Sequence, residues 1–194
     1  MRGAGRQRAG HQVPVRCAVP PGAAITERET PMSDTTTRDT NIASGIQELV
    51  VASGTNSRDH GFHDDWPKAP VRFAADDEAD AYQSGQRRAI AEKLALIHEE
   101  VSEALGEIRS GRDPLEVYFI HKQTGLEYEE QQYDVHGVPQ CKPEGFLVEL
   151  ADAVIRIGDL AYLVGDGDGA ILAGAQRIKA EYNSTRPFKH GRKF

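Results

Sequence analysis

The sequence predicts an all-α protein, a helical bundle interrupted by one β-hairpin-like insertion. Two long segments carry apolar residues at helical spacing, and a shorter segment near the C-terminus repeats this pattern. Glycine, proline and aspartate residues separate these segments from each other. Aromatic and β-branched residues gather between the two long segments, at about residues 112–144, and we expect the insertion there.

The N-terminal region, residues 1–40, is expected to be a disordered extension of a helical domain at 41–194. Residues 1–26 contain no Asp or Glu but several arginines, and they lack the continuous apolar core of a secretory signal. A transit peptide shares this composition. We favour a disordered extension, or translated sequence upstream of a start at Met32. Residues 33–40 read as a polar linker.

The first helix is expected from about Asn41 to near Gly54, and a loop rich in Gly, His, Asp and Pro follows at 56–70. The clearest helix of the first half spans about Gln86 to Ser110. Its apolar residues step by three and four, which predicts one buried stripe. That stripe consists of Ile90, Leu94, Ile97, Val101, Leu105 and Ile108.

A second strong helix is expected from about Phe146 to Val164. Much of its surface is apolar, so we expect burial on several sides or at a subunit interface. The GDGDG turn at 165–169 ends it, and we expect Asp168 to cap a last helix at about 170–182. This turn lacks the later acidic ligands of a calcium loop. The core stripe of the second strong helix consists of Leu147, Leu150, Val154, Ile157, Ala161 and Val164.

Composition excludes several classes of partner. The net charge of −7 provides no global basic field, so we expect no binding to duplex nucleic acid. No apolar run approaches the length of a membrane span, and we expect no membrane association. Cys17 and Cys141 are the only cysteines and lie in different contexts, which favours a reducing, cytoplasmic location without a disulfide.

Two pairs of acids form the main candidate site. Glu100 and Glu103 are three residues apart on one predicted helix, and Glu149 and Asp152 are three apart on the other. Residues at this spacing share a helical face, so antiparallel packing could bring all four together. Like charges a few ångströms apart repel by about 4 kcal/mol per pair at an effective dielectric constant near 20. A cation relieves that repulsion, and oxygen ligands favour Mg²⁺ or Mn²⁺ over Zn²⁺.

The alternative is that these acids are solvated surface residues, as charged helical stripes usually are. The first pair alone carries little weight, because Glu is common in helices. The pair Glu149 and Asp152 is more informative, since it interrupts the most apolar segment of the chain. Burial of two acids there is costly unless they have partners.

These motifs resemble a known family. The segments EKLALIHEEVSEAL (92–105) and EGFLVELADAVIRIGDLA (144–161) are similar to MazG-like nucleotide pyrophosphohydrolases of the all-α NTP pyrophosphatase superfamily. The family pattern, EExxE followed by ExxD, starts here at Glu99 and at Glu149. The resemblance covers roughly 41–194, but forty-five residues separate Glu103 from Glu149, more than in the compact family pattern.

The resemblance implies a homodimer or homotetramer that holds Mg²⁺ through Glu100, Glu103, Glu149 and Asp152. It implies hydrolysis of a nucleoside triphosphate, between the α- and β-phosphates, to the monophosphate and pyrophosphate, in the manner of nucleotide-pool house-cleaning. Either Glu99 or Glu103 could polarise the attacking water. The tail from 179 also resembles the family. Lys93, which lies on the same helical stripe as Glu100, is a candidate substrate-binding residue. The other candidates are Lys179, Asn183 and Arg186.

Two alternatives remain open at this stage. One is a catalytically silent helical module that binds metal and serves protein interaction. Another is a phosphohydrolase centred on His63 and Asp64, although this dipeptide lies in a Gly/Pro-rich loop.

Other residues near these motifs have more than one interpretation. Phe62 and Trp66 could stack on a base, but we favour hydrophobic anchoring of the loop. Asp159 is a possible fifth acid, a partner of Arg156 or a residue facing another subunit. The basic residues at 189–193 could touch phosphates or be a solvated tail.

Overall fold

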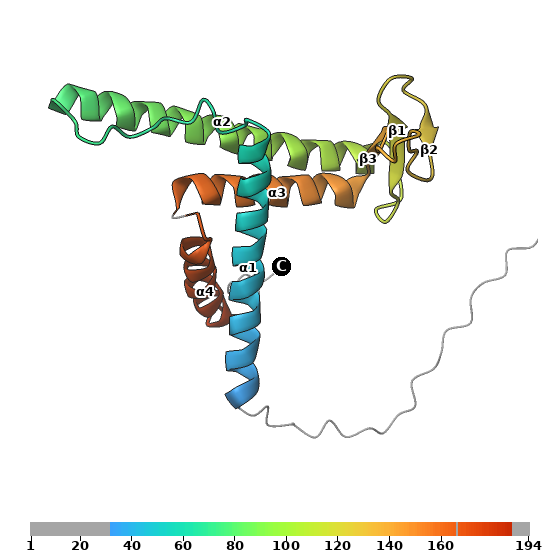
Figure 1. The fold of residues 1–194 in the computed structure, drawn as a ribbon. Coiled ribbons are helices and arrows are strands. Elements are labelled where there is room, and N and C mark those ends of the chain that lie inside the picture. Colours follow the sequence, from blue (N-terminus) through green and yellow to red (C-terminus); the bar gives the residue numbers. More distant parts are fainter. Residues whose placement is uncertain (1–31, 166, 188–194) are drawn as a thin grey trace, which may run out of the picture.

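The structure, a computed structural model, describes residues 32–165 and 167–187, and its main feature is a crossed arrangement of four helices (Figure 1). Helix α2 (Asp76–Arg109) and helix α3 (Phe146–Val164) lie side by side and antiparallel. Helix α1 (Met32–Asp59) crosses this pair, and helix α4 (Ala170–Ser184) packs against α1. The predominantly helical class is therefore confirmed. Among the described residues, no helix is both long and apolar enough to cross a membrane.

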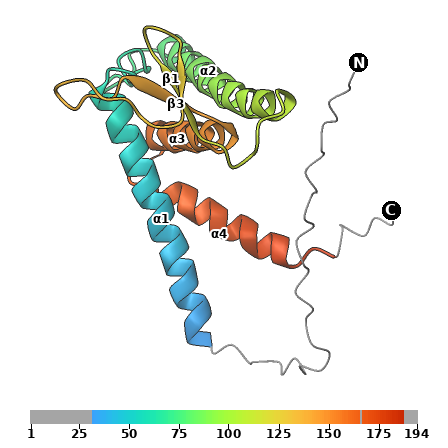
Figure 2. The ribbon, with the colours of Figure 1, turned by 90° about the vertical axis from the view of Figure 1, so that its right-hand side faces the viewer.

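Helices α1 and α4 project together away from the α2–α3 pair (Figure 2). The turn before α4 works as the sequence predicts, because the Asp168 carboxylate accepts a hydrogen bond of 2.8 Å from the backbone N–H of Ala170. That bond satisfies one of the free N–H groups at the start of a helix. Asp168 therefore belongs to a turn that begins α4.

Two helices begin earlier than the sequence indicates. Helix α1 starts at Met32, so residues 33–40 are helical and the expectation of a polar linker there is wrong. Helix α2 starts at Asp76, with three acids in its first turn, where they interact favourably with the helix dipole. The expected disordered segment at 1–31 lies outside the described residues.

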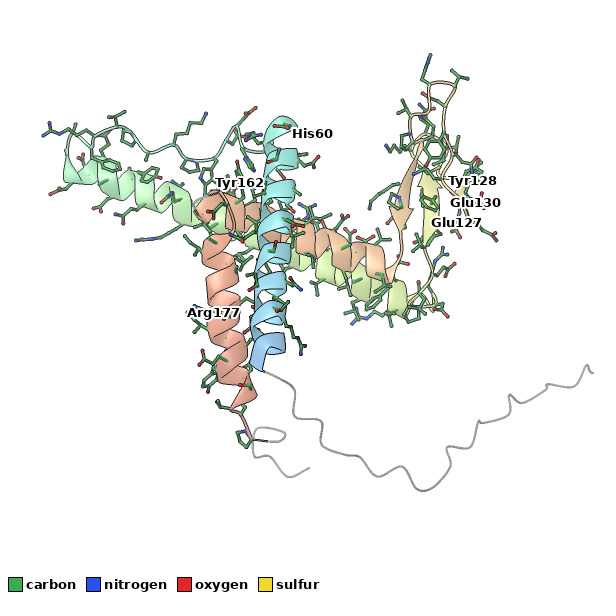
Figure 3. The ribbon with its side chains drawn as sticks, turned by 60° about the horizontal axis from the view of Figure 1, so that its bottom comes forward. His60, Glu127, Tyr128, Glu130, Tyr162 and Arg177 are labelled. Atoms are coloured by element: carbon green, nitrogen blue, oxygen red, sulfur yellow. The ribbon has the colours of Figure 1, made fainter. Side chains whose placement is uncertain are left out.

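Glycine permits the close crossing of α1 over α3. A Cβ atom at Gly54 would lie 2.0 Å from the ring of Tyr162, and one at Gly158 would lie 2.7 Å from Ser53 Oγ. Tyr162 also accepts a hydrogen bond of 3.3 Å from Arg58, and Figure 3 shows Tyr162 close to α1. The crossing therefore fixes the C-terminal end of α1 against α3, beside the candidate site.

The apolar stripes of α2 and α3 do not form the core of the single chain, contrary to expectation. Leu94, Val101, Leu105 and Ile108 of α2 are between 40% and 49% exposed. The buried residues of the two helices are acids and small residues instead, among them Glu100 and Ala104 of α2 and Glu149 and Ala153 of α3. The corresponding exposed residues of α3 are Leu147, Val154, Ile157 and Val164, and the buried apolar residues of the described chain are Val50, Ala104, Cys141, Ala153 and Ala173.

The insertion forms a three-stranded antiparallel sheet at the end of the α2–α3 pair (Figures 1 and 3). Its strands are β1 (Tyr118–His121), β2 (Glu127–Tyr128) and β3 (Cys141–Glu144), in the order β2-β1-β3. The β1–β2 pair is the expected hairpin, and β3 adds a strand on the other side of β1.

Strand β3 leads directly into α3 through Gly145. This residue has φ of 127°, and a Cβ atom there would lie 2.4 Å from the carbonyl oxygen of Glu116. A side chain is therefore excluded both by the backbone conformation and by space. As a result, the sheet delivers Glu144 to the start of α3, one residue before this glycine.

Candidate metal centre

Three carboxylates from two helices meet at the sheet end of the α2–α3 pair. Oxygen atoms of Glu100 and Glu103 on α2 and of Glu149 on α3 all lie within 4.8 Å of one another. Glu149 is 1% exposed and Glu100 4% exposed, whereas Glu103 is open to solvent. The sequence-based prediction that acid pairs from separate helices converge is therefore confirmed for three of the four acids.

Asp152, the fourth predicted acid, lies beside this group rather than within it. Its side chain lines the adjoining cavity. Burial raises the pKa of Asp152, and the negative charge of Glu100 raises it further, against the opposing effect of Lys142 and Arg156. Asp152 thus belongs to the same electrostatic environment as the three-carboxylate group.

Glu149 is the most strongly perturbed acid of the centre. Its Oε2 atom is buried and has no hydrogen-bond partner among the described residues. Burial, the adjacent Glu144 carboxyl group and the charge of Glu103 raise the pKa of Glu149 to about 8, although Lys142 opposes the shift. At neutral pH this carboxyl group therefore holds a proton unless a cation takes its place.

Glu144 is a site residue that the sequence analysis did not identify. Glu144 is the last residue of β3 and lies near Glu149. Lys142 of the same strand forms an ion pair of 3.2 Å with Glu144. The sequence contains Glu144 within the family-like segment, but helical spacing could not reveal its role. Glu144 and Glu149 belong to different elements, and only the turn at Gly145 brings them together.

Arg156 supplies part of the missing positive charge. Its Nε donates a hydrogen bond to Glu100 Oε1, so the proposed pairing of Arg156 with Asp159 is wrong. Among the described residues, Arg156 pairs with Glu100 and no ion pair reaches Glu149. Clustered carboxylate oxygens without a Cys or His ligand are the donors that Mg²⁺ and Mn²⁺ prefer. The buried, unpartnered oxygen of Glu149 makes these residues a suitable site for such an ion.

A cavity of about 590 Å³ adjoins the acids, bounded by the end of α1, the following loop, α2 and α3. Its volume is in the range of small-molecule sites. Aromatic side chains, Phe62 and Trp66, line it together with Lys93 and several acids. These aromatic residues are therefore available to a ligand, which is the interpretation that the sequence analysis ranked second.

Asp159 does not join the carboxylate group. His63 Nε2 lies 2.6 Å from its Oδ1, and Lys93 Nζ donates to its Oδ2 at 2.7 Å. Burial opposes ionisation, but the hydrogen bonds from Lys93 and His63 outweigh it and lower the pKa of Asp159. Neither His63 nor Asp64 belongs to the one possible metal-ligating group in the described part of the chain, which argues against a centre built on them.

The remaining predicted residues lie away from the centre. Glu99 is exposed and is not part of the three-carboxylate group. Lys179, Asn183 and Arg186 are exposed on or just beyond α4, which packs against α1, and none of them lines the cavity. The single chain therefore does not bring these three to the acids. The basic residues at 189–193 lie outside the described residues.

Comparison with protein-family models, with curated proteins and with solved structures finds no match to this chain. The functional argument therefore depends on the geometry and chemistry of the site.

Proposed function

We propose that this protein is an Mg²⁺-dependent nucleoside triphosphate pyrophosphohydrolase of the MazG-like kind that its motifs resemble. It would convert a nucleoside triphosphate and water to the monophosphate and pyrophosphate, as a house-cleaning enzyme of the nucleotide pool does. The observation that carries the proposal is the buried, unpartnered oxygen of Glu149 within a three-carboxylate group. An adjoining cavity of about 590 Å³ supports it.

Glu100, Glu103 and Glu149 would hold the ion, with Asp152 close enough to complete the set through substrate or water. Mg²⁺, or Mn²⁺ in its place, supplies charge neutralisation for phosphate oxygens and orientation of water when it is bound. The acids alone repel a triphosphate, so the proposal requires this ion.

The chain's own residues would orient the substrate in the cavity. Trp66 and Phe62 offer faces for stacking of a base, and the Lys93 ammonium offers hydrogen bonds to phosphate oxygens. Water would attack the α-phosphorus, and the bond from this atom to the bridging oxygen would break with departure of pyrophosphate. Glu103 would accept the proton of the water in preference to Glu99, because Glu103 belongs to the three-carboxylate group and Glu99 does not.

The test is pyrophosphate release from a panel of ribo- and deoxynucleoside triphosphates, measured on the full chain with Mg²⁺ or Mn²⁺. We expect release from at least one nucleotide, complete loss with EDTA and recovery on adding metal. A matched control is Glu107→Gln, because Glu107 is a partly buried carboxylate that binds Tyr118 at 3.0 Å at the sheet end of α2. It should retain the activity.

The same panel tests the alternative function. The exposed apolar faces of α2 and α3 suit a catalytically silent module that binds metal and interacts with other proteins. Stabilisation by Mg²⁺ without turnover of any nucleotide would contradict the enzyme proposal and support that module.

We also propose that the protein is a homodimer or homotetramer. The buried apolar core of the described chain is small, and the exposed stripes of α2 and α3 follow helical spacing, as in helices that pack on a partner. Leu105→Glu should shift the mass in sedimentation to that of a smaller species. Ala95→Glu, an exposed position on another face of α2, should leave the mass unchanged. A wild-type monomer would contradict the proposal.

A further inference from the structure

One buried carboxylate joins three of the elements that border the cavity. Asp159 of α3 accepts a hydrogen bond from Lys93 of α2, at 2.7 Å, and it contacts His63 of the intervening loop at 2.6 Å. Its side chain is 8% exposed. Each oxygen of the carboxylate therefore has a partner, His63 at Oδ1 and Lys93 at Oδ2.

Lys93 is the partner that faces the cavity. Its side chain is 21% exposed and lines the cavity wall. An ammonium group has three donors, and Asp159 uses one, so the others remain for a ligand. Arg156 is the other cation of the lining, and it is engaged by Glu100. Both side chains keep further donors for an anion that enters this cavity, and Lys93 is the one of the two that Asp159 holds.

Fixing a lysine side chain matters because its four-carbon stem is flexible. An unrestrained ammonium loses conformational entropy when it binds an anion, whereas a pre-ordered one has already lost it. The ion pair with Asp159 orders the stem before a ligand arrives. The remaining acids of the lining, Asp65, Glu92 and Asp152, would otherwise offer competing positions for the ammonium.

We propose that Asp159 is a positioning residue that holds the Lys93 ammonium toward the cavity to bind the phosphate chain of the ligand. The naming of a phosphate chain rests on the proposed function, but the positioning role does not require turnover. Because Asp159 is negative, it would weaken anion binding if it acted through charge alone. Positioning and simple electrostatics therefore predict opposite effects of its removal.

The experiment measures binding of inorganic tripolyphosphate to the full chain by calorimetry, with Mg²⁺ present. Asp159→Ala should weaken binding about tenfold, which corresponds to the loss of one charge-assisted contact. In a Lys93→Met background, the same change should have less than a twofold effect, because the group that Asp159 positions is gone. Asp159→Asn keeps an acceptor for Lys93 and should restore most of the affinity.

Glu107→Ala is the control, since it removes a partly buried carboxylate far from the cavity and should leave tripolyphosphate binding unchanged. Tighter binding by Asp159→Ala, equal weakening in both backgrounds, or no binding by the wild type would overturn the proposal. If Asp159→Ala does not fold, Asp159→Glu replaces it in the double-mutant comparison with Lys93→Met. We expect Asp159→Glu to weaken tripolyphosphate binding, and an unchanged affinity would contradict the proposal. Coupled binding without hydrolysis of any nucleotide would uphold the positioning role and remove only the proposed enzyme activity.

Discussion

Glu149 and Asp159 are both buried carboxylates on α3, yet their surroundings shift their pKa values in opposite directions. Asp159 has Lys93 and His63 as partners, and its pKa is lowered. Glu149 lies among other carboxyl groups, has an unpartnered oxygen, and has a pKa raised to about 8. Both carboxylates are buried, so their partners make the difference. The charge of Asp159 is balanced by groups of the chain, whereas Glu149 requires an added cation.

The largest expected effect is on turnover. Glu149→Gln keeps the size of the side chain but removes a negative oxygen donor from the proposed ion site. Loss of several kcal/mol of transition-state stabilisation corresponds to a decrease on the order of 10³-fold in kcat. The measurement is pyrophosphate release under saturating Mg²⁺. Activity within tenfold of wild type would show that Glu149 does not belong to the centre.

A second prediction concerns the stability of the metal-free protein, measured in EDTA. Between pH 4.5 and about 8, folded Glu149 keeps a proton that the unfolded chain has lost, so the free energy of unfolding should fall as pH rises through this range. The expected fall is on the order of 3 kcal/mol. Denaturant titrations in EDTA would measure it, and Glu149→Gln should flatten the slope. A stability that rises toward pH 8 in wild type would contradict the assigned protonation.

Asp159 should show the opposite pH dependence. Its folded pKa is lowered, so its stabilisation is present above the unfolded value of 3.8 and is lost as pH falls through the folded pKa. Asp159→Asn should reduce the free energy of unfolding by about 2 kcal/mol at pH 7, since charge-assisted hydrogen bonds are lost. Chemical denaturation at pH 7 and pH 3 checks this. If Asp159→Asn destabilised the protein equally at pH 7 and pH 3, the negative charge of Asp159 would not account for the stabilisation.

The smallest effect is expected at Glu144. Glu144→Gln removes a negative neighbour of Glu149, so the pKa of Glu149 should move down toward its ordinary value. In the metal-free protein, the fall in the free energy of unfolding across the same pH range should then be smaller by roughly 1 kcal/mol. An unchanged slope would indicate that Glu144 does not contribute to the raised pKa of Glu149.

Sequence reasoning could predict the parts of this molecule that depend on local patterns. The bounds expected for α3 agree with Phe146–Val164, because apolar periodicity fills that segment and glycines flank it. The i and i+3 acids were identified because a helix places such residues on one face. The apolar stripes were recognised too, but the expected burial within the chain was wrong, since periodicity does not say whether a face meets its own chain or another one.

The rest of the site depends on contacts between elements distant in sequence. Glu144 approaches Glu149 across a strand-to-helix turn, and Asp159 meets Lys93 and His63 from two other elements. No spacing rule connects those positions. The start of α1 was missed for a related reason. The segment 33–40 has few apolar residues, and it belongs to a helix whose later turns pack against other helices.

The junction at Gly145 has a mechanical consequence. One residue, Gly145, separates the last residue of β3 from the first residue of α3. Displacing strand β3 by a small distance would therefore drag one carboxyl group relative to its neighbour and retune the proton affinity of the pair. We therefore expect a truncation or a cross-link that shifts β3 to change the pKa of Glu149.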